Sequence, residues 1–405
     1  MSTKASTRHV IAAALLTGGL AATAIVQAPQ LRAQTTAPPS APAAPTPATP
    51  QPEQSPPSVP APPPGMIPTT QVPFYADWAG SPHAKRDAEE FNHWNKEGVI
   101  PVACARCHST PGFQDYLGAD GSAPAKVDHP APVGTVITCV ACHNNKTLGL
   151  TNVTFASGIT AHNQGASAIC MTCHQGVEST SSVNKALAGI ADDQVTPKLE
   201  FINAHYTAAA AMLLGSQAQA GYQYPGKTYA GRFAHQAPYT TCITCHELHA
   251  LSVKVNDCAA CHKEVTDKAS LHMIRADKID RDGNGDINEG VAQEIDHLKA
   301  KLLAAIMDYA KMVAKKPVAY TPEVYPYFFV DTNGNGKADK NEAKFPNRYK
   351  SWTPRLMKAA YNYQFVFKDP GAYAHNANYA AELLHDSLAD LGAKVKVDLD
   401  KATRP

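Results

Sequence analysis

Five copies of the motif Cys-x-x-Cys-His hold all ten cysteines of this chain. Pairs of cysteines at this spacing also occur in disulfides, structural zinc sites and redox dithiols. Only covalent haem attachment requires the histidine that follows, because two thiols bind the vinyl groups of one haem and the adjacent histidine ligates its iron. Histidine makes up 17 of 405 residues, so the probability that it follows every pair by chance is negligible. The sequence therefore predicts five haems c, attached at Cys104, Cys107, His108; Cys139, Cys142, His143; Cys170, Cys173, His174; Cys242, Cys245, His246; and Cys258, Cys261, His262.

The opposite face of each iron needs a ligand of its own. A second histidine leaves no open coordination position and favours electron transfer, whereas an open face would admit a substrate. His297 and His385 fall within amphipathic helical patterns and are expected to face solvent or packing. The candidates for the distal ligands are His83, His93, His205, His235, His249 and His375. We therefore expect mainly bis-histidine haems and no catalytic residue.

The N-terminal residues have the pattern of a secretory signal. Lys4 and Arg8 precede an apolar run, and small residues end in the cleavage-site pattern Leu31-Arg32-Ala33. Residues 1–33 are therefore predicted to be a signal peptide, which places the protein in the periplasm or outside the cell. The alternative is an uncleaved helix, the one circumstance in which we expect membrane contact. Residues 34–73 are rich in proline and alanine and are predicted to be a disordered linker.

The remaining chain changes character near residue 267. Residues 74–267 have many Gly and Pro breaks, irregular spacing and short apolar runs. This composition predicts a pentahaem cytochrome c domain of mainly α and much irregular structure, with haems as its core. Residues 268–396 are predicted to be a helical domain, with 397–405 as a tail. Its apolar periodicity predicts helices over Val291–Val313, Pro354–Val366 and Asn376–Leu391.

Two loops in the helical region have the pattern of EF-hand calcium loops. The first has oxygen donors at every required position, glycine at the sixth and glutamate at the twelfth, with ligands predicted at Asp331, Asn333, Asn335, Lys337 (through its carbonyl) and Glu342. The second is weaker because Val291 stands at the twelfth position, where Glu289 or Glu294 would have to substitute. Its candidate ligands are Asp280, Asp282, Asn284 and Asp286. The alternative for both loops is an Asx-rich turn without metal.

The charge balance limits the classes of partner. The formal net charge is +1, and each haem adds two propionates, so the haem-loaded protein is expected to be acidic. The sequence has no basic patch of the kind that binds nucleic acid, and we expect none to bind. The expected partners are redox proteins or a terminal electron acceptor, with self-assembly into a cytochrome filament as a further option.

Several short sequence segments at and near the motifs resemble those of bacterial multihaem c-type cytochromes of respiratory and extracellular electron transfer. They are Ser-Pro-His-Ala, Cys-Ala-Arg-Cys-His-Ser-Thr, Cys-Met-Thr-Cys-His-Gln-Gly, Asn-Ala-His-Tyr and Ala-His-Asn. This resemblance implies electron transfer. The five motifs, the calcium-like loop and the late helices with His375-Asn376 are also similar, more distantly, to the pentahaem nitrite reductases. Those enzymes usually bind the active-site haem through a lysine, whereas all five motifs here end in histidine.

The sequence leaves three functional hypotheses. The main one is electron transfer through a chain of five haems outside the cytoplasm. The second is an oxidoreductase that reduces nitrite or a related oxyanion at one open haem. The third is a subunit of a polymeric cytochrome filament.

Overall fold

The fold was analysed in a computed structural model, which describes residues 71–405. The predicted signal peptide and all but the last three residues of the predicted linker lie outside the described residues. Within the described part, none of the helices is both long and apolar enough to cross a membrane.

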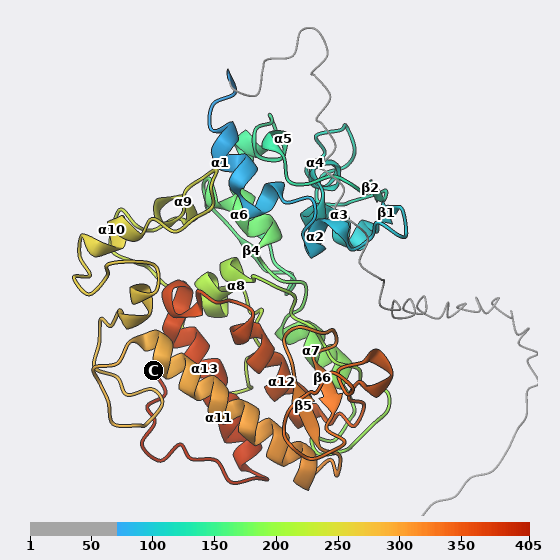
Figure 1. Ribbon diagram of the computed structural model, residues 1–405, viewed down its shortest axis with the longest axis vertical. Helices are drawn as coiled ribbons and strands as arrows, with labels where there is room; N and C mark the ends of the chain where they lie inside the picture. Colours follow the sequence, from blue (N-terminus) through green and yellow to red (C-terminus); the bar gives the residue numbers. More distant parts are fainter. Residues whose placement is uncertain (1–70) are drawn as a thin grey trace, which may run out of the picture. The chain divides into compact units, whose positions relative to one another are not determined.

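The part of the chain that carries the motifs contains short helices joined by long loops (Figure 1). Three two-stranded antiparallel ribbons occur within residues 71–405, pairing β1 with β2, β3 with β4 and β5 with β6. The short helices are α1 (Tyr75–Gly80), α2 (Glu89–Asn92), α3 (Val102–His108), α4 (Thr110–Leu117), α5 (Cys139–Cys142), α6 (Ser167–Cys173), α7 (Thr180–Leu187), α8 (Ala209–Leu214), α9 (Cys242–Cys245) and α10 (Val255–Ala259). The strands are β1 (Val99–Ile100), β2 (Ala131–Pro132), β3 (Val153–Thr154), β4 (Thr160–Ala161), β5 (Val318–Tyr320) and β6 (Phe328–Val330). The prediction of a mainly helical fold with much irregular structure is confirmed.

Three long helices near the C-terminus follow the predicted periodicity closely. They are α11 (Val291–Met312), α12 (Pro354–Phe367) and α13 (Ala372–Gly392). Helix α13 begins four residues before its predicted start, but its backbone leaves helical geometry at Asn376. The side-chain Oδ1 of Asn376 accepts a hydrogen bond from the Tyr379 amide at 3.1 Å, as an N-cap residue does. The sequence pattern therefore marked the start of the second, longer segment of α13.

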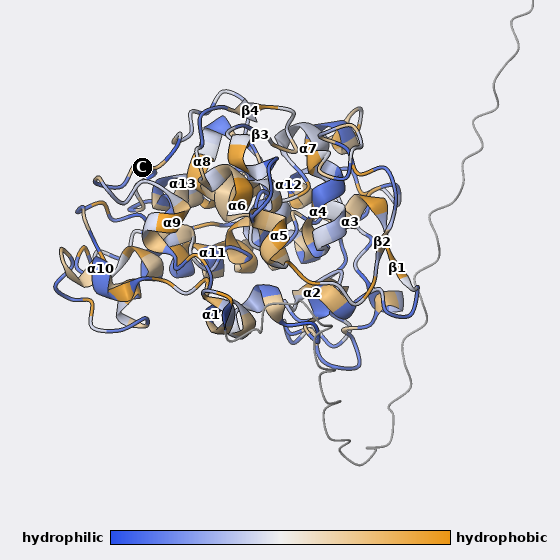
Figure 2. Cartoon of the chain, turned by 90° about the horizontal axis from the view of Figure 1, so that it is seen from above, coloured by the Kyte–Doolittle hydropathy of each residue, from blue (hydrophilic) through white to orange (hydrophobic). Residues whose placement is uncertain are grey.

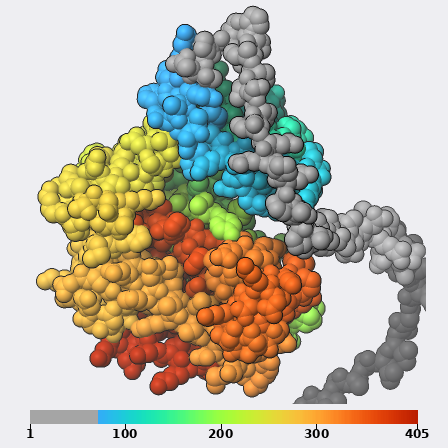
Figure 3. All heavy atoms as spheres, viewed as in Figure 1, coloured from blue at the N-terminus to red at the C-terminus, as the bar shows by residue number. Residues whose placement is uncertain are grey.

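The largest hydrophobic core lies between the long helices and extends into the motif-bearing part of the chain. It includes Leu298 of α11, Tyr361 of α12 and Leu384 of α13, together with Met212 of α8 and Met171 of α6. The apolar residues gather on the helices, whereas the loops are mostly hydrophilic (Figure 2). Figure 3 shows residues near 250 (yellow) beside the blue-green N-terminal part and the orange and red C-terminal helices. Residues on both sides of the predicted boundary at 267 thus contribute to one core, and the boundary itself stays a prediction.

The fully buried side chain of Asn362 joins α12 to the segment before the fourth motif. Its Oδ1 accepts a hydrogen bond from the Tyr222 amide at 2.7 Å, and its Nδ2 donates to the Tyr222 carbonyl at 2.9 Å. The same Nδ2 donates to Ser387 Oγ on α13 at 3.1 Å. One amide side chain therefore satisfies both backbone groups of a buried residue in a loop.

We expect Asn362→Ala to lower the free energy of unfolding by about 2–5 kcal/mol, because it leaves the Tyr222 amide and carbonyl buried without partners. Chemical denaturation of the haem-loaded protein measures this change. The control is Asn184→Ala on the exposed surface of α7, where the change should stay within about 0.5 kcal/mol. Equal effects of the two variants would contradict the role assigned to Asn362.

Candidate haem and metal sites

Each Cys-x-x-Cys-His motif forms one turn of helix. In four motifs the histidine amide donates to the carbonyl of the first cysteine at 2.8–2.9 Å, and the first motif lies wholly within α3. Residues three and four positions apart lie on the same face of a helix. The turn therefore points the two thiols and the histidine toward one side, as attachment and ligation of one haem require. None of the ten cysteines pairs with another in a disulfide, so the disulfide alternative is not realised in this structure.

Every motif histidine faces one histidine from elsewhere in the chain. Five of the six distal candidates make these pairs, and each of the five faces the histidine of a different motif. The pairs, with the distances between ring centroids, are His83 with His174 (6.2 Å), His108 with His205 (5.7 Å), His143 with His249 (6.3 Å), His235 with His262 (6.3 Å) and His246 with His375 (6.5 Å).

The spacing of these pairs fits an iron between the two rings. Two imidazole nitrogens on opposite sides of a metal, each about 2 Å from it, hold their ring centroids roughly 6 Å apart. Four of the pairs lie at 6.2–6.5 Å. The fifth is closer, with 3.4 Å between the Nε2 atoms of His108 and His205. The residues present therefore fit bis-histidine haem at all five motifs.

Several of these histidines are oriented by a hydrogen bond at Nδ1, which leaves Nε2 free to bind a metal. His108 Nδ1 contacts the Glu90 carbonyl at 2.8 Å, and His174 Nδ1 contacts the Thr207 carbonyl at 3.3 Å. His375 differs because its Nδ1 lies 2.8 Å from a carboxylate oxygen of Asp369. The motif histidines His108 and His174 thus have backbone carbonyls behind them, whereas the distal candidate His375 has a carboxylate.

Burial keeps two of the distal candidates neutral. It lowers the pKa of His83 to about 4, helped by His174, and it lowers the pKa of His205 to about 4, helped by His108 and Lys368. A neutral imidazole is the form that binds a metal. His205 also has a left-handed backbone, with φ of 75°, which costs a non-glycine residue about 1–3 kcal/mol. Its amide donates to Asn203 Oδ1 at 3.1 Å, which helps to hold this conformation.

Helix α6, which carries the third motif, lies next to two other motifs. The Cys107 thiol contacts the Cys173 carbonyl at 4.0 Å, and the Cys173 thiol contacts the Arg106 carbonyl at 3.7 Å. The Cys242 amide donates to Ser167 Oγ on α6 at 3.2 Å. The third motif therefore lies between the first and the fourth, an arrangement that sequence spacing did not indicate.

The fourth and fifth motifs, whose first cysteines are 16 residues apart in sequence, are also neighbours. The Lys254 amide donates to the Cys245 carbonyl at 2.9 Å, and the Cys258 thiol contacts the Lys254 carbonyl at 3.8 Å. A single residue thus bridges the two attachment turns.

The structure does not bring His93 to a motif histidine. Its side chain is 58% exposed, and its Nδ1 lies 2.7 Å from Glu89 Oε1 one helical turn earlier. The adjacent Trp94 is the residue that meets a motif histidine, with its ring edge-on to His108 at 5.1 Å. Of the six candidates, His93 is therefore the one without haem-site geometry.

Sequence reasoning missed four residues that contact the histidine pairs. Phe74 stacks on His249 with 4.5 Å between ring centroids, and Trp94 packs on His108. Asp369 and Lys368 reach His375 and the surroundings of His205 from the end of α12. None of these residues belongs to a motif. Only Trp94, which lies close in sequence to the first motif, could have been noticed as a candidate from the sequence.

The Asp331 loop has the internal hydrogen bonds expected of a calcium loop. The two oxygens of Asp331 accept from the Gly334 and Gly336 amides at 2.7 and 2.9 Å. Glu342 reaches back across the loop, and its Oε1 accepts from the Thr332 amide at 2.7 Å. Hydrogen bonds from the Thr332 hydroxyl and amide lower the pKa of Glu342, which favours the ionised form that a cation needs. The loop therefore has the internal hydrogen bonds of a calcium loop, and its residue types fit a calcium ion.

The Asp280 loop has the same geometry but a different carboxylate. Asp280 accepts from the Gly283 and Gly285 amides at 2.7 and 2.9 Å. Glu294, one of the two predicted substitutes, accepts from the Arg281 amide at 2.9 Å and so takes the structural place that Glu342 has in the first loop. However, Glu294 also pairs with the guanidinium groups of Arg281 and Arg275 at 3.0 and 3.1 Å. The charge that calcium would neutralise is thus already paired with arginine.

The other predicted substitute, Glu289, belongs to the same loop, and its side chain is only 10% exposed. It clusters with Asp282 and His297, whose Nδ1 lies 2.6 Å from Asp282 Oδ2. His297 is half exposed, as predicted, and His385 packs in the interior with its Nε2 2.7 Å from the Arg281 carbonyl.

We expect Glu294→Gln to lower the free energy of unfolding by about 3–5 kcal/mol, because it removes the buried carboxylate that pairs with both Arg281 and Arg275. The measurement is chemical denaturation in the presence of a chelator, which removes any contribution from calcium. Glu200→Gln is the matched control, since Glu200 is 78% exposed and pairs with Arg348 at 3.5 Å, and its loss should cost less than about 1 kcal/mol. A Glu294 effect as small as the control would show that the arginines are satisfied without it.

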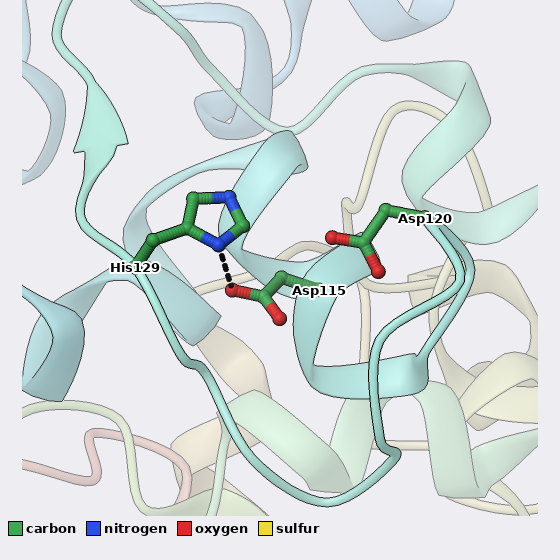
Figure 4. Close-up of side chains that lie close together, drawn as sticks. All are labelled: Asp115, Asp120 and His129. Atoms are coloured by element: carbon green, nitrogen blue, oxygen red, sulfur yellow. Dashed lines mark ion pairs between the residues drawn. The ribbon is translucent and has the colours of Figure 1, made fainter.

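A third group of possible ligands is made by Asp115, Asp120 and His129 (Figure 4). The buried Asp115 accepts hydrogen bonds from Ser122 Oγ and the Asp128 amide, both at 3.0 Å, and lies 3.2 Å from His129 Nδ1. The Asp115 oxygens thus accept hydrogen bonds that hold the loop after α4. We therefore interpret this cluster as a structural contact.

Comparison with known proteins gives homology to polyhaem cytochromes. The chain is 26% identical over 366 residues to the C-type polyheme cytochrome OmcB of Geobacter sulfurreducens strains DL-1 / KN400 and PCA, covering 74% of this chain and 45% of the relative. It is also 26% identical over 367 residues to the C-type polyheme cytochrome OmcC of strain PCA. The chain thus spans less than half the length of these relatives. No family model matches, and no solved structure matches.

The motifs, their helical turns and the paired histidines define a protein built to hold several haems. The homology agrees, and the chain is a multihaem c-type cytochrome. The similarity to pentahaem nitrite reductases finds no counterpart among these relatives.

Proposed function

We propose that this protein is an electron carrier that binds five haems c, each between a motif histidine and a distal histidine, in the periplasm or outside the cell. The observation that carries the proposal is the one-to-one pairing of motif and distal histidines. With a histidine on each side, no iron keeps an open position for a substrate. The proposed distal ligands are His83, His205, His235, His249 and His375.

Haem iron alternates between its ferric and ferrous states and so carries one electron at a time. The chain's own residues contribute the spacing and the environment. The motif cysteines would anchor the cofactors covalently, and α6 would keep the third site beside the first and the fourth. The Lys254 bridge keeps the fourth site beside the fifth. Redox proteins or a terminal acceptor would be the partners.

The two alternative functions, oxyanion reduction and filament formation, each require a structural feature of their own. Reduction of an oxyanion requires one iron with an open face, whereas within residues 71–405 each motif histidine has a histidine opposite. A filament requires contacts between copies of the chain, and microscopy of the purified protein would reveal them.

The ferric absorption and EPR spectra of the purified protein test the proposal. We expect only low-spin iron in the unaltered protein and one high-spin haem in His205→Ala, because that variant removes one distal ligand. His205→Met should restore a low-spin haem, since methionine also ligates haem iron. His93→Ala is the matched control and should leave the spectrum unchanged. A high-spin fraction in the unaltered protein that binds nitrite or cyanide would overturn the electron-carrier proposal in favour of an enzyme.

We also propose that the Asp331 loop binds a calcium ion that stabilises the helical part of the chain. The donors are Asp331, Asn333, Asn335, the Lys337 carbonyl and Glu342. The Asp280 loop is proposed to need no calcium, because Arg281 and Arg275 already neutralise Glu294.

Calcium should raise the melting temperature of the haem-loaded protein, because a ligand at 100 times its dissociation constant adds about 2.7 kcal/mol to stability. Glu342→Gln should remove most of this increase, while Glu323→Gln, an exposed glutamate outside the loop, should keep it. The measurement is a thermal melt with added calcium or chelator. The calcium proposal fails if the melting temperature of the unaltered protein ignores both additions.

A further inference from the structure

Two oppositely charged residues, Lys368 and Asp369, lie side by side at the C-terminal end of α12. Both are almost fully buried, at 4% exposure each. They reach toward different histidine pairs, Asp369 toward that of the fourth motif and Lys368 toward that of the first. A buried charge near a redox centre acts strongly because little water screens it.

Asp369 contacts the distal candidate of the fourth site directly. Its carboxylate oxygens lie 2.8 and 3.0 Å from His375 Nδ1, and one of them also accepts from the Gly371 amide at 3.1 Å. The amide contact fixes the carboxylate in position behind the ring. A carboxylate on the outer nitrogen of a ligating imidazole makes that imidazole a stronger electron donor. This favours ferric over ferrous iron.

Lys368 holds a positive charge beside the distal candidate of the first site. Its Nζ lies 3.5 and 3.7 Å from the ring centroids of Tyr206 and Tyr327, an arrangement that attracts a cation. It also donates to Asn203 Oδ1 at 3.2 Å, the same oxygen that accepts from the His205 amide. The charge is therefore linked to the backbone of His205 through the Asn203 side chain. A nearby positive charge favours ferrous over ferric iron.

We propose that Lys368 and Asp369 set the reduction potentials of two haems in opposite directions. Lys368 raises the potential of the haem between His108 and His205, and Asp369 lowers that of the haem between His246 and His375. This inference rests on the proposed haem ligation. Because the third motif contacts both the first and the fourth, the two charges bias electrons to move from the fourth site through the third to the first.

The test is a spectroelectrochemical redox titration of the haem-loaded protein at about pH 6, below the pKa of about 7 to which burial lowers Lys368. Asp369→Asn should shift one low-potential component to a more positive potential and leave the other components in place. Lys368→Met should shift a different component to a more negative potential. Asp369→Glu and Lys368→Arg, which keep the charges, should restore most of each shift.

Matched controls are available on the same helices. Lys358→Met removes another buried lysine of α12, which lies over Tyr222 and Tyr224 at 5.9 and 5.5 Å but faces no histidine pair. Asp386→Asn removes a buried carboxylate of α13 that pairs with Arg404. Both should leave every component of the titration unchanged.

The outcomes separate this inference from the proposed function. If the EPR spectra of Asp369→Asn and Lys368→Met stay low-spin while both titrations overlay that of the unaltered protein, the tuning role is wrong and bis-histidine ligation stands. Shifts of equal size in the controls would also overturn the tuning role. If His375→Ala and His205→Ala leave the spectra unchanged, the ligation itself is wrong, and this inference fails with it.

Discussion

The approach of each motif histidine to a histidine from another segment is the contact on which the motif-bearing part of the molecule depends. These pairs join residues far apart in the chain, such as His108 to His205 and His246 to His375. The segment between His108 and His205 contains only short helices and two-residue strands, which cannot bury much apolar surface alone. Long-range pairing around shared cofactors would therefore order a region that has little regular secondary structure.

The long C-terminal helices contribute to this pairing in a way that their lack of attachment motifs conceals. Helix α13 provides His375, and the end of α12 places Asp369 behind it. Asn376, next to His375, breaks the helix and donates to the Gly231 carbonyl at 2.8 Å. The helical part is thus a rigid support for the fourth site as well as a compact core.

The two calcium-like loops share one backbone geometry but differ in the charge that surrounds their inward-reaching glutamate. Both fold their first aspartate onto two glycine amides at the same distances. The Asp331 loop turns Glu342 inward without a cationic side chain beside it, whereas the Asp280 loop pairs Glu294 with two arginines. The two loops share the motif pattern. Their charge balance differs because Glu294, which comes from the first turn of α11, pairs with arginines.

Local sequence patterns were enough to predict the attachment residues, the three long helices and a short set of candidate distal histidines. Attachment chemistry and helix periodicity are local, so adjacent residues specify them. The packing of the chain, in contrast, specifies which histidine faces which motif, that His93 faces none, and that Lys368 and Asp369 lie beside two of the pairs. These contacts join residues that are far apart in the chain, and they depend on how α6, α12 and α13 pack, which no local pattern encodes.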